Sequence, residues 1–139
     1  MPKYNWVEKY SVGVREIDKQ HGHYFDMVNN IIKLTGQDNV SIDDLIPKIN
    51  ELCDYARYHF STEENIFKKY SYLNIKEHMD AHEIYWEKMD QFILKAKTAG
   101  ENTKKIAMEV AEFAGSWLIN HIMMMDQKYI IFMHQNGIK

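Results

Sequence analysis

The sequence predicts an all-α protein, an antiparallel up-down-up-down four-helix bundle with an extended N-terminal arm. Three observations predict this fold: four long stretches carry apolar or ring side chains at helical spacing, glycine and proline are few, and the connections between the stretches are short. Helices joined by short connections pack as antiparallel neighbours. We therefore expect a single domain over residues 1–139.

The composition narrows the class of protein. A chain of 139 residues with 45% hydrophobic and 27% charged residues is typical of one globular domain. A net charge of −3 argues against nucleic-acid and polybasic membrane-binding surfaces. No segment has the roughly 18 to 20 apolar residues of a membrane span, and the first residues lack a secretory signal. The lone Cys53 cannot form an intrachain disulfide. We expect a cytoplasmic protein with no nucleic-acid or membrane partner.

The first half of the chain contains the arm and two of the expected helices. Residues 1–18 have no sustained period and are predicted to form the arm. Apolar and ring side chains recur at helical spacing over about 18–35, and the turn-forming residues 36–39 end that helix. The second helix spans about 42–68 after an N-cap at Ser41, and its Pro47 predicts a kink or a later start.

The second half contains the other two helices. The segment 74–77 (Asn-Ile-Lys-Glu) is a capping box for a third helix over about 75–98, which Gly100 is expected to end. The fourth helix is expected over about 103–135, with Gly137 beyond its end.

Two pairs of metal-ligating residue types lie on the apolar stripes, His59-x-x-x-Glu63 and His78-x-x-x-His82. Residues four apart share one helical face, so each pair can converge on one point. A helical HxxxH pair is about as often accidental as metal-binding. Spacing alone therefore leaves both interpretations open.

Two further histidines, His21 and His121, lie in the first and fourth stripes. Taken singly, each is better explained as a core histidine satisfied by hydrogen bonds. However, the separations between ligand positions on successive helices are 38, 15 and 39 residues, and an antiparallel bundle brings such positions to one level. Four helices that direct imidazole or carboxylate groups inward need a compensating centre, because burying unpaired polar groups is costly.

Asp126 is the weakest candidate on spacing. It follows His121 by five residues, about 140° further round an ideal helix. Its carboxylate reaches the same centre only if the helix is locally distorted or the metal pair is spread out. On spacing alone, a solvated aspartate is the default interpretation.

Taken together, these motifs resemble the hemerythrin family in its bacterial single-domain form. The motifs are Asp18-x-Gln20-His21, His59-Phe60-x-x-Glu63-Glu64, His78-x-x-x-His82 and Trp117-Leu118-x-Asn120-His121-x-x-x-x-Asp126. The resemblance implies two iron ions per chain (Fe²⁺/Fe³⁺) with a bridging oxo or hydroxo group. It implies the following ligands: His78, His82 and His121 on one iron, His21 and His59 on the other, and Glu63 and Asp126 as bridges.

The resemblance also implies reversible O₂ binding for storage, delivery or sensing, at an open position on the two-histidine iron, with NO or azide as alternative ligands. It implies an apolar ligand pocket formed by Phe60, Trp117, Leu118 and Ile122. Tyr24 departs from the family, which usually has leucine three residues after the first histidine. Its phenol is expected near the open position, where it donates to bound ligand, holds a water or points away between helices.

Two other functions stay open. The same centre fits a di-iron enzyme acting on peroxide or nitric oxide, and it fits an oxygen- or iron-sensing signalling module. Five neutral imidazoles with two carboxylates leave the centre net positive, which disfavours strongly oxidised iron and hence oxidative turnover. We therefore expect a ligand-binding protein and not an enzyme.

Overall fold

The computed structural model describes residues 3–98 and 102–139. These residues contain helices and no strand. The long helices are α1 (Arg15–Leu34), α2 (Ile42–Lys69), α3 (Ile75–Thr98) and α4 (Thr103–Met124). The short ones are η1 (Glu8–Tyr10), η2 (Asp126–Tyr129) and α5 (Ile130–Gln135). The predicted all-α four-helix bundle is confirmed. Gly100, expected to end the third helix, lies outside the described residues.

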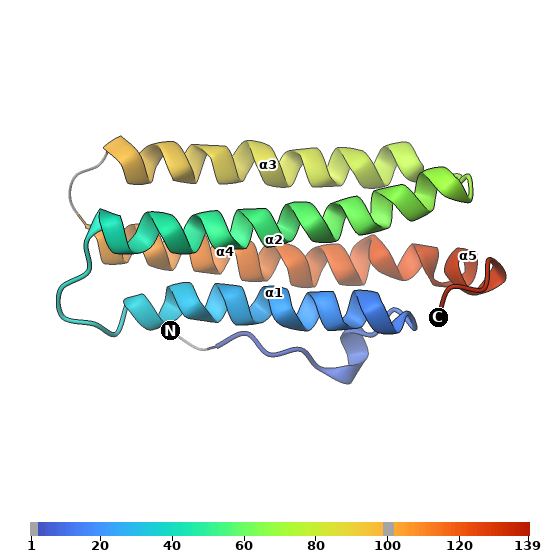
Figure 1. Ribbon diagram of the computed structural model, residues 1–139, viewed down its shortest axis with the longest axis horizontal. Coiled ribbons are helices and arrows are strands. Elements are labelled where there is room, and N and C mark those ends of the chain that lie inside the picture. Colours follow the sequence, from blue (N-terminus) through green and yellow to red (C-terminus); the bar gives the residue numbers. More distant parts are fainter. Residues whose placement is uncertain (1–2, 99–101) are drawn as a thin grey trace.

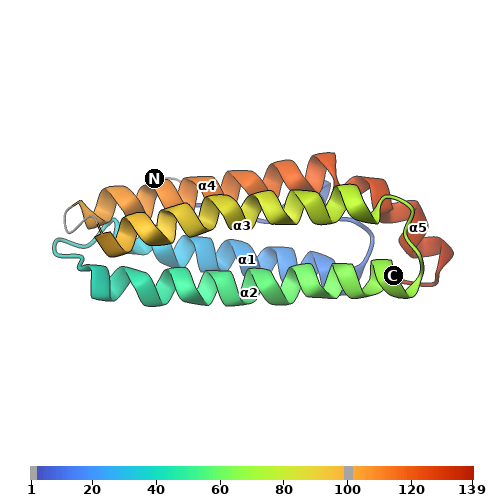
Figure 2. The same cartoon turned by 90° about the horizontal axis from the view of Figure 1, so that it is seen from above.

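The four long helices lie side by side, and consecutive helices run in opposite directions (Figures 1 and 2). Helix α1 packs against α2 and α4, and α3 packs against the same two helices. The apolar stripe of each helix therefore faces the bundle axis, and the core runs along its whole length. Each fully buried large apolar side chain contributes about 1.5–3 kcal/mol to stability. None of the described helices combines the length and the apolar character that crossing a lipid bilayer demands.

Helix α2 begins directly after Ser41, where the sequence predicts its N-cap, and the structure has a capping box there. The hydroxyl of Ser41 accepts from the backbone N–H of Asp44 (3.2 Å), and the Asp44 carboxylate accepts from the backbone N–H of Ser41 (3.0 Å). Pro47 lies inside the helix and does not delay its start. The cap satisfies N–H groups that the first helical turn leaves free, which stabilises a start that Pro47 weakens.

The N-terminal arm lies along α1 (Figure 1), and it also contacts α4. The backbone of Tyr4 exchanges two hydrogen bonds with the amide of Asn29 on α1 (2.9 and 2.8 Å). The Tyr4 ring covers Gly115 on α4 so closely that a Cβ there would overlap it. Helix α1 starts at Arg15, so the arm is slightly shorter than the expected residues 1–18.

The expected fourth helix, about 103–135, is interrupted. Helix α4 ends at Met124, and Met125 leaves helical geometry with φ −113° and ψ −53°. The chain continues as the 3₁₀ turn η2 and the short helix α5. Because of this break, the side chains after Met124 point in other directions than they would in a continuous helix. Among them, the side chain of Asp126 is buried in the interior of the bundle.

A buried pair of tyrosines joins three of the helices. Tyr24 on α1 is fully buried, and its hydroxyl lies 3.0 Å from the Ala114 carbonyl on α4 and 3.1 Å from the Tyr85 hydroxyl on α3. The Tyr24 hydroxyl is the donor in both contacts, so its single proton is shared between the Ala114 carbonyl and the Tyr85 hydroxyl oxygen. Burial raises the pKa of both phenols, which keeps them protonated.

Tyr24→Phe is expected to lower the free energy of unfolding by about 1–3 kcal/mol, because it removes the donor from which the Ala114 carbonyl and the buried Tyr85 hydroxyl both accept. Tyr85→Phe should cost less, since Tyr24 then still donates to Ala114. Because the two hydroxyls share one hydrogen bond, the double variant should lose less stability than the two single losses added together. Urea unfolding of the four proteins measures this coupling. Strict additivity would show that the hydroxyls act independently.

Candidate metal centre

Seven polar side chains meet in the otherwise apolar interior of the bundle. Their exposed fractions are all 4% or less. Helices α1 and α4 contribute one each, α2 and α3 two each, and η2 the last. They are His21, His59, Glu63, His78, His82, His121 and Asp126. The structure thus brings together all seven residues singled out in the sequence as candidate ligands.

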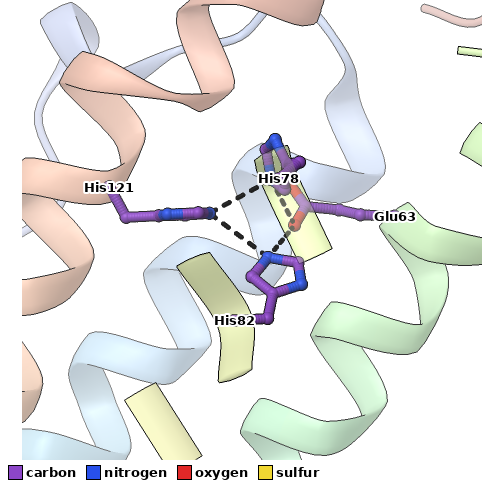
Figure 3. Close-up of side chains that lie close together, drawn as sticks. All are labelled: Glu63, His78, His82 and His121. Atoms are coloured by element: carbon purple, nitrogen blue, oxygen red, sulfur yellow. Dashed lines mark hydrogen bonds and ion pairs between the residues drawn. The ribbon is translucent and has the colours of Figure 1, made fainter. Parts of the chain in front are cut away.

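The seven side chains form two groups that share Glu63. In each group the ligating atoms lie within 4.8 Å of one another. The three-histidine group has His78, His82 and His121 around Glu63 (Figure 3). The two-histidine group consists of His21, His59, Glu63 and Asp126.

The nitrogens of the three-histidine group have the spacing of ligands around one ion. The Nε2 atom of His121 lies 3.1 Å from Nε2 of His78 and 3.2 Å from Nε2 of His82. Two imidazole nitrogens bound at a right angle, each about 2.1 Å from a metal, lie about 3.0 Å apart. In the two-histidine group, Nε2 of His21 and Nε2 of His59 are likewise 3.1 Å apart. Both groups therefore fit a metal ion at their centre.

The carboxylate of Asp126 spans the two groups. Its Oδ1 lies 3.1 Å from Nε2 of both His78 and His121, and its Oδ2 lies 3.2 Å from Nε2 of His21. The break after Met124 makes this reach possible, since a continuous helix directs residue 126 elsewhere. The five-residue spacing between His121 and Asp126 requires a local distortion of the helix if Asp126 is to reach the centre, and this distortion is present.

Three carboxylate oxygens near these nitrogens have no hydrogen-bond partner despite their burial: Glu63 Oε1 and both Asp126 oxygens. Short N···O distances without aligned hydrogen bonds indicate that nitrogens and oxygens converge on a common point between them. Leaving buried carboxylate oxygens unpartnered costs several kcal/mol. A cation at each convergence point removes that cost.

The pKa values reflect this crowding of charge. Burial lowers the pKa of His59 to about 3, so its imidazole is neutral, the form that binds metals. Burial opposes charge on His78 as well, but contacts with Asp126 and Glu63 raise its pKa to about 9. Despite burial, the surrounding imidazoles hold the pKa of Glu63 and Asp126 well below the ordinary range. The two carboxylates therefore favour a positive charge beside them.

Further polar contacts orient two of the imidazoles. His59 donates from Nδ1 to Oε1 of Gln20 (2.8 Å), and His82 donates from Nδ1 to Oε2 of Glu64 (2.7 Å). Both contacts place the proton on Nδ1, which leaves the Nε2 lone pair directed at the centre. The buried hydroxyl of Tyr129 donates to Oε2 of Glu63 (2.6 Å) and fixes that carboxylate.

Aromatic rings enclose the three-histidine group. Phe60 stacks on His82 with ring centroids 3.9 Å apart, and Trp117 stacks on His121 at 4.4 Å. Leu118 and Ile122 are fully buried nearby on α4. Tyr24 takes the third arrangement considered from the sequence, since its hydroxyl points between helices to Ala114 and Tyr85.

Comparison with known proteins agrees with this architecture. Residues 12–130 match the sequence model of the hemerythrin HHE cation binding domain. The chain belongs to the hemerythrin family. It is 27% identical to a bacteriohemerythrin of Clostridium acetobutylicum, covering 90% of this chain and 97% of the relative. It is 29% identical to a hemerythrin-like protein of Naegleria gruberi, covering 91% of this chain and 90% of the relative.

Solved hemerythrin structures have the same fold. A wild-type hemerythrin crystal structure superimposes with a TM-score of 0.75 at 25% identity, covering 90% of this chain and 93% of that one. A hemerythrin L114A mutant has a TM-score of 0.77 at 24% identity, covering 93% and 95%. The family predicted from the sequence motifs is confirmed.

The sequence alone indicated no role for Tyr129, Gln20 and Glu64. Gln20 and Glu64 directly neighbour His21 and Glu63 in the motifs. This adjacency was the only sequence feature that pointed to a role for them. Tyr129 follows Asp126 by three residues, one turn of a 3₁₀ helix, so the signal appears only once the chain after Met124 is known to form such a turn.

Tyr129→Phe is expected to destabilise the metal-free protein by about 1.5–3 kcal/mol, because a buried carboxylate loses a hydrogen bond. Glu63 has a folded-state pKa below its ordinary 4.5. Its ionised form therefore stabilises the fold above about pH 4.5, and this contribution is lost as pH falls through the folded-state pKa.

The loss caused by Tyr129→Phe should thus stay constant at higher pH and shrink in acid. Urea unfolding at several pH values measures it. Tyr58→Phe is the matched control, because Tyr58 is 54% exposed and the change there should cost less than about 0.5 kcal/mol. Equal losses in the two variants would contradict the role given to Tyr129.

Proposed function

We propose that this chain binds two iron ions in its interior and binds O₂ reversibly at one of them. The observation that carries the proposal is the convergence of five imidazoles and two carboxylates into two adjoining groups, bridged by Asp126 and sharing Glu63. His78, His82 and His121 would hold one iron, and His21 and His59 the other. Glu63 and Asp126 would bridge the pair, together with a solvent-derived oxo or hydroxo group.

The donor set suits iron. Imidazole binds iron well, and carboxylates bridge readily, whereas zinc and copper also accept nitrogen-rich sites. Membership of a cation-binding family supports a metal centre here, and the relatives named bacteriohemerythrin support its assignment as an oxygen-binding di-iron centre. When bound, a pair of ferrous ions supplies the two electrons on which reversible O₂ binding depends.

The two groups differ in a way that leaves room for a ligand. One has three histidines and the other has two, while Glu63 belongs to both groups and Asp126 of the second also lies 3.1 Å from His78 and His121 of the first. With the two carboxylates and a bridging oxo or hydroxo group, a six-coordinate ion would have a full set of ligands in the first group and one open position in the second. This asymmetry supports a small diatomic ligand at the His21–His59 side, with NO or azide as alternatives to O₂.

The surrounding side chains would protect that ligand. Phe60, Leu118 and Ile122 are buried and apolar, and Trp117 is half-buried, so water has little access to the centre. Exclusion of water suppresses proton-assisted loss of a reduced oxygen ligand. The hydroxyl of Tyr24 donates to Ala114 and so has no proton left for a ligand. We propose an oxygen-storing, oxygen-delivering or oxygen-sensing protein of the cytoplasm and not an enzyme.

The purified protein is expected to hold two irons per chain, and its ferric azide and oxygenated forms should show visible charge-transfer bands. Metal analysis and absorption spectra of the reduced protein, before and after air, make the measurement. A carrier regains its reduced spectrum when O₂ is removed, whereas an enzyme acting on peroxide or nitric oxide consumes reductant in each cycle. Stoichiometric zinc after growth with ample iron, without these bands, would exclude the proposal.

His59→Ala and His82→Ala should affect different irons. We expect His59→Ala to abolish azide and O₂ binding, because it removes a ligand of the iron that has the open position. His82→Ala should release the iron of the three-histidine group. Affinity should fall more than about 100-fold at the affected iron, since even outer partners of ligands contribute 10–100-fold.

Iron content and azide titration of both variants test the assignment. His23→Ala is the control, because His23 is exposed and lies outside both groups. Two irons and normal O₂ uptake in both variants would show that the assigned ligands are wrong.

A further inference from the structure

The two groups of candidate ligands differ in the side chains that hold their imidazoles from behind. Among the described residues, two of the five imidazoles donate from Nδ1 to another side chain. His82 of the three-histidine group donates to Glu64 (2.7 Å), and His59 of the two-histidine group donates to Gln20 (2.8 Å). The partner is therefore a carboxylate in one group and an amide in the other.

The amide of Gln20 is fixed as an uncharged acceptor by its own neighbours. Its Nε2 donates to Oε1 of Glu16 (3.2 Å) and to Oγ1 of Thr62 (3.3 Å). Both amide protons are thus used away from His59, and the carbonyl oxygen is left to accept from that imidazole. The two-histidine group therefore has a neutral partner whose orientation is set.

Glu64 brings a full negative charge to the three-histidine group. Its side chain is 23% exposed, so water stabilises the carboxylate, whereas the imidazole of His82 is only 2% exposed. Phe60 stacks on this imidazole with centroids 3.9 Å apart and planes within 13°. The stack and the hydrogen bond hold the ring with Nδ1 on the carboxylate and Nε2 beside Nε2 of His121.

A charged partner changes what an imidazole gives to a metal ion. A carboxylate that attracts the Nδ1 proton makes Nε2 a stronger electron donor, and an amide oxygen does this more weakly because it lacks a full charge. A stronger donor stabilises ferric iron more than ferrous iron, since the ion of higher charge gains more from it. The proposed bridges Glu63 and Asp126 would serve both irons and so would not create this difference.

We propose that Glu64 makes the iron of the three-histidine group the more easily oxidised of the two. When a one-electron oxidant takes a single electron from the diferrous pair, the oxidant is reduced and the three-histidine iron becomes ferric. The iron with the open position stays ferrous, the state that takes up O₂. Glu64 acts through His82 and would touch neither iron. This inference rests on the proposed di-iron function, and it adds the order in which the irons are oxidised.

The potentials of the two irons test the proposal. The iron-loaded protein is titrated without air between dithionite and ferricyanide, and the ferric bands are followed against potential. Wild type should show two one-electron steps. Glu64→Gln keeps an oxygen acceptor in place and removes only the charge. The lower potential should therefore rise by about 59 mV, a tenfold change in the ratio of ferrous to ferric iron, and the higher potential should move less.

Glu83→Gln is the matched control, because Glu83 directly follows His82 and is exposed. It removes the same charge next to the same candidate ligand, and both potentials should shift far less, since solvent and salt screen an exposed charge. Glu64→Ala should raise the lower potential at least as far as Glu64→Gln. Wild-type potentials in Glu64→Gln, with a change only in Glu64→Ala, would show that Glu64 fixes the ring without tuning the iron and would overturn the proposal.

Zinc binding tests the same partner without iron. Zn²⁺ is titrated into the metal-free protein in competition with a chromophoric chelator. Glu64→Gln should lower the affinity for one of two ions about tenfold, the low end of the effect of outer partners of metal ligands, and Glu83→Gln should leave both affinities unchanged. Equal affinities in Glu64→Gln and wild type would overturn the role of Glu64. Failure here is distinct from failure of the iron proposal, which iron analysis and azide spectra decide.

Discussion

The interaction on which the rest of the structure depends is the attraction between two buried carboxylates and the positive charge that must lie among five imidazoles. Glu63 and Asp126 have no exposed surface, and their pKa values lie well below the ordinary range, so they stay ionised inside an apolar bundle. Uncompensated, this arrangement would oppose folding by several kcal/mol. Contacts with Asp126 and Glu63 raise the pKa of His78 to about 9, so the two carboxylates favour a positive charge beside them.

That constraint explains features that otherwise look like defects of a regular bundle. Helix α4 ends at Met124, although the apolar pattern of the sequence continues. The break directs the Asp126 carboxylate inward, to His121. The 3₁₀ turn that follows also brings the hydroxyl of Tyr129 to Glu63. One backbone irregularity therefore positions one bridging carboxylate directly and holds the other by a hydrogen bond.

Much of the fold and of the candidate site could be predicted from the sequence, because both depend on periodicities that are local to each helix. The pair His78–His82 shares a face by helical geometry alone, and the helix lengths bring four such faces to one level. What could not be predicted depends on partners distant in sequence. The direction of the Tyr24 hydroxyl depends on Ala114 and Tyr85, which are 90 and 61 residues away. The reach of Asp126 depends on a backbone break whose position no local pattern marks, and spacing alone wrongly favoured a solvated residue.

The candidate ligands come from both helical hairpins, so a bound metal pair would connect the two halves of the chain. The imidazoles of one group come from the α3–α4 hairpin and those of the other from the α1–α2 hairpin, whereas Glu63 of the first hairpin and Asp126 beyond the second cross between them. A pair of ions held this way is a cross-link between the two halves of the chain. Separating the hairpins would then require breaking metal–ligand bonds, so bound metal would slow unfolding of the bundle.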